Sequence, residues 1–313
     1  MSASITHDEL DGSPSLTLTV GDLEAVVVPT VGMVVASLRH RGTEVLGQRG
    51  GLAAYREHGS SFGIPLLYPW ANRLDGLRYD AAGCAVELHA SASPIRLDRR
   101  GLPIHGLLTA SPRWVVTGTA CGERFAAITA AIELGAYPEL MAGFPFPHRL
   151  ELTHELDALG LRTSVTMTAE DERAVPISFG FHPYLAPGGD RSSWRIELPV
   201  TTRALLDDRG VPTGTLERAT PGWRPLADDA YDDLFPSLAA PAVFRVEAPE
   251  RMIEVAFGEA YRCAQVYAPA TADFICFEPM TAPTNALVTG DDLRELAPGG
   301  TFTASFGIRI EAR

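Results

Sequence analysis

Short runs in which apolar and polar residues alternate recur from one end of this 313-residue sequence to the other. The clearest runs are SLTLTV, LEAVVVP, LRTSVTMT, WRIELPV, VFRVEA, MIEVAFG and FTASFGIRIEA. A period of two is the repeat of a β-strand, whose successive side chains point to opposite faces, so each run predicts a strand with one buried face. Turn residues bound the runs, and Gly21-Asp22 joins the first pair as a two-residue hairpin connection. The pattern predicts antiparallel sheet that opens with a hairpin.

Helical periodicity is scarce, because only DDLREL near residue 291 and the segment 48–58 are compatible with a turn or two of helix. The sequence contains no low-complexity linker, charge block or fixed-period repeat, which favours one domain over residues 1–313. We therefore predict an all-β fold, a large antiparallel β-sandwich with few short helices. In such a fold the ligand site is expected on a concave face or among the loops.

The charge balance limits the partners of this chain. Its 39 acidic and 26 basic residues give a formal net charge of −13, which disfavours nucleic acid and anionic membranes. The opening MSASITHDELDGS has no apolar core of a signal peptide, and no run of about 18 apolar residues occurs, so a cytoplasmic location is expected. All the basic residues are arginine, which excludes lysine Schiff bases, pyridoxal phosphate anchoring and the P-loop lysine.

The cysteines give no sign of a metal centre or redox pair. Cys84, Cys121, Cys263 and Cys276 lie far apart with no CxxC spacing. Without an export signal, disulfide pairing is not favoured. We expect buried free thiols.

Three ionisable residues lie in unusually apolar surroundings. His105 in LPIHGLL and His182 in SFGFHPYL are flanked by Pro, Gly and apolar residues, whereas His7, His40, His58, His89 and His154 fit surface or strand-face positions. Either histidine alone is compatible with a core residue bonded to a backbone carbonyl. Glu278 interrupts the apolar run FICFEPM, and a buried carboxylate there needs a partner.

An arginine in an aromatic loop offers that partner. GIPLLYPWANRLDG contains Arg73 together with Tyr68 and Trp70. Aromatic faces pack on the C–H face of a pyranose, and guanidinium and carboxylate groups hydrogen-bond its hydroxyls. This composition is typical of a sugar site, with Trp70 as the expected stacking residue, although a structural ion pair beside core aromatics has the same local sequence.

Five short segments, taken in order, resemble the aldose 1-epimerase (mutarotase) family of the galactose mutarotase-like fold. They span most of the chain and are Ala71-Asn72-Arg73, Ile104-His105-Gly106, Phe181-His182-Pro183-Tyr184, Tyr-Asp-Asp-Leu-Phe at 231–235 and Phe-Glu-Pro at 277–279. The continuation Leu-Ala-Pro-Gly-Gly after Tyr184 differs from that of the galactose enzymes. The resemblance therefore leaves the identity of the sugar open.

The resemblance implies roles for individual residues. Glu278 matches the general base, His182 the general acid, and His105 a histidine that binds substrate and supports charge development. The implied sugar-binding residues are Arg73, its neighbour Asn72, and Asp232, which is chosen over the adjacent Asp233.

The reaction implied is the exchange of α and β anomers by ring opening and reclosure. A carboxylate removes the proton of the anomeric hydroxyl while an imidazolium on the opposite side of the bond protonates the ring oxygen. Nothing is oxidised or transferred, so no cofactor and no metal is implied. The expected partner is a small-molecule sugar, bound by a monomer or a homodimer.

Two rival functions remain open at this stage. A mutarotase for hexose 6-phosphates needs a cationic pocket, for which Arg96, Arg99 and Arg100 are candidates, although the same residues fit a solvated loop. A non-catalytic carbohydrate-binding or sensing protein needs the cleft but not both an acid and a base. Comparing glucose with glucose 6-phosphate separates the first rival, and sugar binding without mutarotation identifies the second.

Overall fold

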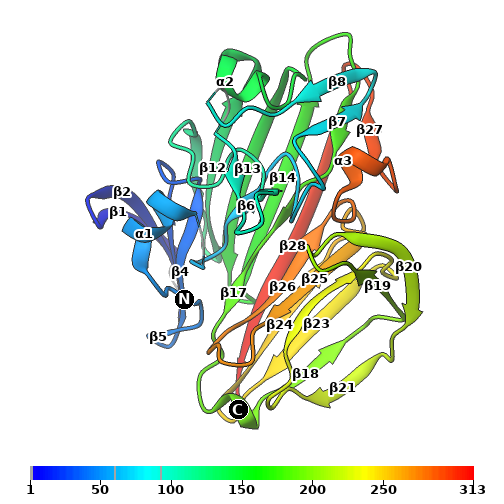
Figure 1. Cartoon of the computed structure of the whole chain (residues 1–313). Coiled ribbons are helices and arrows are strands. Elements are labelled where there is room, and N and C mark those ends of the chain that lie inside the picture. The colour runs from blue at the N-terminus through cyan, green and yellow to red at the C-terminus, as the bar shows by residue number, and fades with distance from the viewer. Residues whose placement is uncertain (1–2, 60, 92–93) are drawn as a thin grey trace.

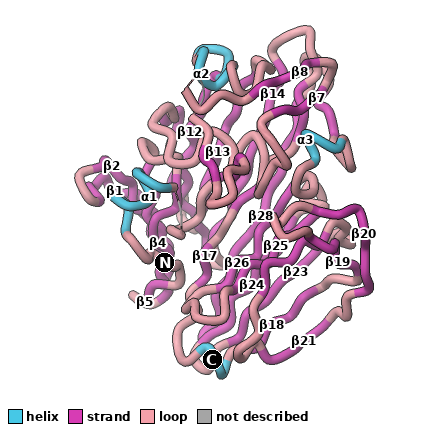
Figure 2. Tube along the Cα trace, in the orientation of Figure 1, coloured by secondary structure: helices cyan, strands magenta, loops and turns pink. Residues whose placement is uncertain are grey.

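β-Strands make up most of the computed structural model, which describes residues 3–59, 61–91 and 94–313 (Figure 1). Every ladder between the named strands of these described residues is antiparallel. The helices are short and lie at the margins of the molecule in Figure 2. They are the α-helices α1 (Gly51–His58), α2 (Pro138–Met141) and α3 (Ala286–Thr289), and the 3₁₀ turns η1 (Leu134–Ala136) and η2 (Arg191–Ser193).

A nine-stranded sheet runs through the whole molecule. In spatial order its strands are β11 (Val115–Cys121), β12 (Phe125–Glu133), β13 (His148–Asp157), β14 (Leu161–Ala169), β28 (Thr301–Ala312), β24 (Arg251–Phe257), β23 (Ala242–Glu247), β18 (Arg195–Leu198) and β21 (Gly222–Pro225). The last strand of the chain, red in Figure 1, pairs with β14 on one side and β24 on the other. It therefore joins the strands of the two halves of the chain into one sheet.

Two smaller sheets pack against this one. A five-stranded sheet contains β1 (Ala3–Leu10), β2 (Ser13–Val20), β3 (Leu23–Val28), β4 (Val34–His40) and β5 (Thr43–Glu44). A six-stranded sheet contains β22 (Tyr231–Phe235), β25 (Cys263–Ala268), β26 (Ile275–Met280), β16 (Gly180–Phe181) and β6 (Leu66–Leu67), with β17 (Tyr184–Leu185) also pairing with β26.

Aromatic side chains join the layers. Phe181 of β16 lies 5.0 Å from Phe306 of β28, and Phe277 of β26 lies 5.4 Å from Phe244 of β23, measured between ring centroids. Strand β2 contacts β12 and β13, and β3 contacts β13. Because apolar faces of opposed sheets interdigitate here, one core cluster extends from Leu16 to Ile310. The predicted all-β fold, a large antiparallel β-sandwich with few short helices, is confirmed.

Four two-stranded antiparallel sheets form much of the remaining structure. They pair β7 (Arg78–Ala81) with β8 (Cys84–Glu87), β9 (Arg96–Leu97) with β10 (Pro103–Ile104), β15 (Val175–Ile177) with β27 (Arg294–Leu296), and β19 (Thr202–Leu206) with β20 (Pro212–Arg218). Among the described residues no helix has the length and apolar character that a bilayer crossing requires.

Several local predictions can be compared with these elements. The segment 48–58 contains helix α1, and Gly21-Asp22 joins β2 to β3, but β1 precedes this hairpin and was not predicted. DDLREL is not helical, because α3 ends at Thr289, before the segment begins, and Arg294–Leu296 pairs with β15. All four cysteines lie in the described residues as free thiols, but only Cys263 and Cys276 are buried.

Candidate active site

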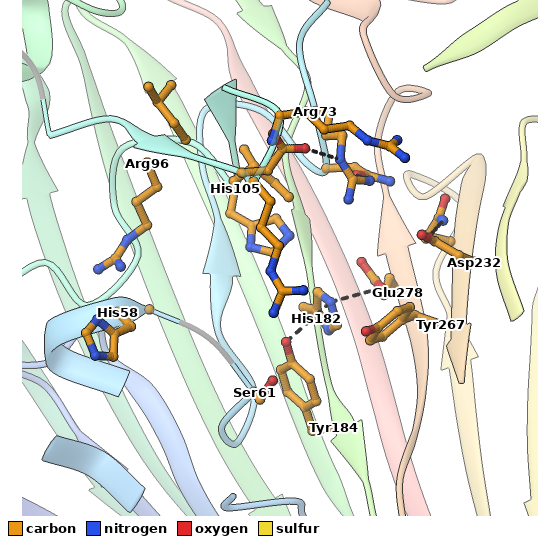
Figure 3. A pocket seen from close by; sticks show the side chains of 18 of the residues that line it. His58, Ser61, Arg73, Arg96, His105, His182, Tyr184, Asp232, Tyr267 and Glu278 are labelled. Carbon is orange, nitrogen blue, oxygen red and sulfur yellow. Dashed lines mark hydrogen bonds and ion pairs between the residues drawn. The ribbon is translucent and has the colours of Figure 1, made fainter. Parts of the chain in front are cut away.

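A cavity of about 790 Å³ opens beside the six-stranded sheet, where it meets the loops between α1 and β10. It is large enough for a sugar. All the predicted site residues except Trp70 line it: Asn72, Arg73, His105, His182, Asp232 and Glu278. Figure 3 shows the side chains of His105, His182 and Glu278 converging on this cavity from separate parts of the fold.

Glu278 and His182 form a buried pair at the centre of the cavity. Glu278 lies in β26, where every residue is buried, and His182 follows the short strand β16 that pairs with β26. The imidazole Nε2 lies 3.2 Å from the Glu278 Oε1, and the two side chains are 7% and 3% exposed. The Tyr184 hydroxyl lies 3.4 Å from the same Nε2, and the Tyr184 ring stacks on the imidazole at 4.4 Å. The imidazole is thus held in one orientation.

Burial governs the protonation of this pair. Burial raises the pKa of the Glu278 carboxyl well above its usual 4.5, and the Asp232 carboxylate adds to the shift. Burial also lowers the pKa of the His182 imidazole well below its usual 6.5. Within the pair, a proton is therefore favoured on Glu278 over His182. The carboxylate–imidazolium form has the same number of protons and is reached by moving one proton across the contact.

The two groups of the pair are in direct contact with each other. The anomeric oxygen and the ring oxygen of a pyranose are bonded to the same carbon, so a base and an acid that serve both have to reach the same end of the sugar. Contact at 3.2 Å between His182 and Glu278 satisfies that condition.

His105 is held at the cavity by its backbone. Its φ is 63°, and its N–H donates to the Asn72 carbonyl at 2.9 Å. A Cβ at Gly106 would lie 2.1 Å from the Tyr68 carbonyl oxygen, so only glycine permits this close approach of the two backbone segments. The imidazole ring lies edge-on to His182 at 5.4 Å. Burial and then the charges of Arg73 and Arg96 lower the pKa of His105 to about 3, so its imidazole is neutral at pH 7.

Arg73 is fixed by a carboxylate that the sequence did not reveal. Its Nε donates to Asp98 Oδ2 at 2.9 Å and an Nη donates to Asn72 Oδ1 at 3.0 Å. Asp98 Oδ1 also accepts the N–H groups of Arg100 and Leu102. Burial opposes ionisation of Asp98, but the donors from Leu102, Arg73 and Arg100 outweigh it and lower the pKa of the carboxyl.

The expected ion pair between Arg73 and Glu278 is therefore wrong. Glu278 contacts His182, and Arg73 contacts Asp98. Arg73 acts on Glu278 only through its charge, which partly opposes the rise in the Glu278 pKa.

Both asparagines of the sequence hold the Arg73 segment in place. Asn72 and Asn285 have φ of 52° and 73°, a region that asparagine tolerates better than most residues. The Asn285 N–H donates to the Arg73 carbonyl at 3.0 Å, and its Oδ1 accepts the Asp75 N–H at 2.8 Å. Both positions thus have a structural reason for asparagine.

The register of β22 separates the two adjacent aspartates. Asp232 lines the cavity and accepts a hydrogen bond from Gln265 Nε2 at 2.7 Å. Asp233 points away and pairs with Arg203 at 2.9 Å. Gln265 is opposite Glu278 in the ladder between β25 and β26, so it lies in the same cavity.

The structure corrects the position expected for Trp70. Its side chain is 0% exposed and belongs to the main core cluster, as does Tyr68, whose hydroxyl hydrogen-bonds to the buried His148. The aromatic residues that line the cavity are instead Tyr184 and Tyr267. Trp70 therefore does not contact a ligand in this cavity.

Sequence reasoning missed several cavity residues. Asp98, Gln265 and Tyr267 carry no motif, and only strand pairing brings them here. His58, expected at the surface, is exposed but lines the cavity. His154 is buried in β13, where its ring bonds to Thr163 and to a backbone carbonyl.

Comparisons with known proteins identify the family and the fold of this chain. Residues 14–309 match the sequence pattern of the family described as aldose 1-epimerase. The chain is 24% identical to the uncharacterized protein YihR of Escherichia coli (strain K12), over 97% of this chain and 95% of YihR. Two solved structures share the fold over 100% of this chain and 99% of theirs. One is a galactose mutarotase-like protein from Clostridium acetobutylicum, with 18% identity and a TM-score of 0.86. The other is the galactose 1-epimerase from Lactobacillus acidophilus NCFM, with 14% identity and a TM-score of 0.78.

Proposed function

Since this chain belongs to the aldose 1-epimerase family, we propose that it interconverts the α and β anomers of an aldopyranose by acid–base ring opening and reclosure. The observation that carries the proposal is the contact between His182 and Glu278 inside a cavity of sugar size. Binding alone does not require an acid and a base in contact, so the pair favours an enzyme over a carbohydrate-binding protein.

The proposed steps use only groups of the cavity. The Glu278 carboxylate takes the proton of the anomeric hydroxyl, and the His182 imidazolium gives a proton to the ring oxygen. The bond between the anomeric carbon and the ring oxygen breaks, which leaves an open-chain aldehyde. After rotation about the bond from C1 to C2, the C5 hydroxyl attacks the other face and both protons return by the reverse steps.

The neighbouring residues have supporting tasks in this scheme. Neutral His105, edge-on to His182, is placed to hydrogen-bond the substrate near the ring oxygen. Arg73, fixed by Asp98, and Asp232, fixed by Gln265, offer one cationic and one anionic partner to the ring hydroxyls. Rigid support of this kind favours one orientation of the sugar.

The direct test is anomer exchange with purified protein. Freshly dissolved α-aldohexoses are followed by polarimetry, and exchange between the anomeric signals is measured by NMR. We expect acceleration proportional to enzyme concentration. Binding of a sugar without acceleration for every member of the panel would instead identify a carbohydrate-binding protein.

Replacing Arg73 is expected to weaken sugar binding more than it slows the chemical step. In Arg73→Ala the half-saturating sugar concentration should rise by about tenfold to a hundredfold, because a charged hydrogen bond to a hydroxyl is lost. Steady-state kinetics measures both quantities. Arg78→Ala, which removes an exposed arginine paired with Glu87, is the control and should leave both unchanged. Unaltered half-saturation with every active sugar would contradict the assigned role of Arg73.

A further inference from the structure

The cavity is richer in arginine than the rest of the chain. Five arginines line it against three carboxylates, whereas the whole sequence has 26 basic and 39 acidic residues. Arg73 is neutralised by Asp98. For Arg96, Arg99 and Arg100, no carboxylate lies within ion-pair distance in the part of the chain that the structure describes. The cavity thus holds cationic groups that no described protein anion compensates.

Arg96 is built into the wall of the cavity. It lies in β9 directly opposite Ile104 of β10, so the hairpin places it beside His105. Its side chain is half-buried, and burial lowers the pKa of its guanidinium. Gly59 has φ of 64°, and a Cβ there would lie 2.2 Å from the Arg96 Cζ, so the guanidinium packs directly on the Gly59 backbone. A partly desolvated cation without a counterion is costly, and a bound anion would offset that cost.

Charge is distributed unevenly across the cavity. Figure 3 shows Asp232 and Glu278 on one side, Arg96 and His58 on the other, and His105 and His182 between them. This order from Glu278 through His182 and His105 to Arg96 matches the bonding order of a pyranose. The anomeric hydroxyl is bonded to C1, C1 to the ring oxygen, the ring oxygen to C5, and C5 to C6. A sugar with its anomeric hydroxyl at Glu278 and its ring oxygen at His182 therefore directs C6 toward Arg96.

We propose that the substrate of this epimerase is an aldopyranose with a phosphate or sulfate group on C6, which Arg96 binds with Arg99 and Arg100. The proposal rests on the epimerase function given above and names its substrate class. Guanidinium groups present several N–H donors in a plane, which suits the oxygens of a tetrahedral anion. Arg99 and Arg100 are exposed at the cavity and add attraction for an anion on a protein that is otherwise acidic.

Substrate comparison provides the first test. Values of kcat/KM for anomer exchange are measured by NMR for glucose, galactose and mannose, for their 6-phosphates and 6-sulfates, and for glucuronate as a carboxylate. We expect at least one 6-phosphate or 6-sulfate to exceed its parent sugar by about tenfold or more. Acceleration of the parent sugars with no such preference would overturn this proposal alone. Acceleration of no sugar at all would overturn the epimerase function as well.

Substitution of Arg96 locates the anion site. In Arg96→Met the preference for the 6-phosphate or 6-sulfate over the parent sugar should fall by about tenfold to a hundredfold, and Arg96→Lys should restore part of it. Arg41→Met, which removes an exposed arginine paired with Asp22, should retain the preference of the unmodified protein. A full preference in Arg96→Met would overturn the assignment of this site.

A measurement on the unmodified protein does not depend on the folding of a variant. Inorganic phosphate or sulfate should inhibit exchange of the C6-charged sugar competitively, while chloride at equal ionic strength should inhibit it less. Equal inhibition by all three salts indicates general screening of charge and would overturn an ordered anion site.

Discussion

Glu278→Gln is expected to slow anomer exchange by about 10²–10⁴-fold, because the amide has no basic oxygen to take the proton of the anomeric hydroxyl. The substitution is nearly isosteric with the protonated carboxyl that burial favours. The protein should therefore fold, and sugar affinity should change little. Polarimetric rates and sugar binding by calorimetry, measured on the same preparation, separate these two effects.

The control for this variant is Glu295→Gln, which changes an exposed carboxylate of β27 outside the cavity and should retain full activity. Near-normal rates in Glu278→Gln would remove Glu278 from the chemistry. Loss of activity together with loss of sugar binding would assign it to binding instead.

Local patterns predicted the strands, but not which strands pair. LRTSVTMT and FTASFGIRIEA alternate because each has one face on the core, as β14 and β28 show. Their pairing joins residues more than a hundred positions apart, which no local pattern encodes. DDLREL shows the converse error. Its spacing permits a helical turn, but Asp292 has φ of 47° and pairing with Val175–Ile177 makes the end of the segment a strand.

The same distinction holds for the candidate site. His105, His182 and Glu278 were identified because ionisable residues in apolar segments are costly and therefore conspicuous. Trp70 was misplaced because an aromatic ring suits both a sugar and a core, and sequence alone does not separate the two. Asp98 and Gln265 were missed because only the β9–β10 hairpin and the β25–β26 register bring them into the cavity.

His182→Asn should also lower the rate by about 10²–10⁴-fold, because the ring oxygen loses its proton donor while Glu278 remains able to act as a base.

The pH dependence of the rate gives a second readout that a purely structural role of His182 would not produce. In the unmodified protein the active pair holds one proton. Since the pKa of His182 is lowered, the pair gains a second proton only below the usual histidine value of 6.5. Since the pKa of Glu278 is raised, the last proton leaves well above 4.5.

The unmodified enzyme should therefore show a rate maximum between an acid and an alkaline limb. Activity falls when the pair holds two protons and also when it holds none. In His182→Asn only Glu278 titrates, so the small remaining rate should rise with pH to a plateau and show no alkaline decline. His7→Asn, in an exposed position of β1, should retain the two-limbed profile. If His182→Asn kept both limbs at a normal rate, the proton donor to the ring oxygen would have to be sought elsewhere in the cavity, with Tyr184 next to the same Nε2 as the first alternative.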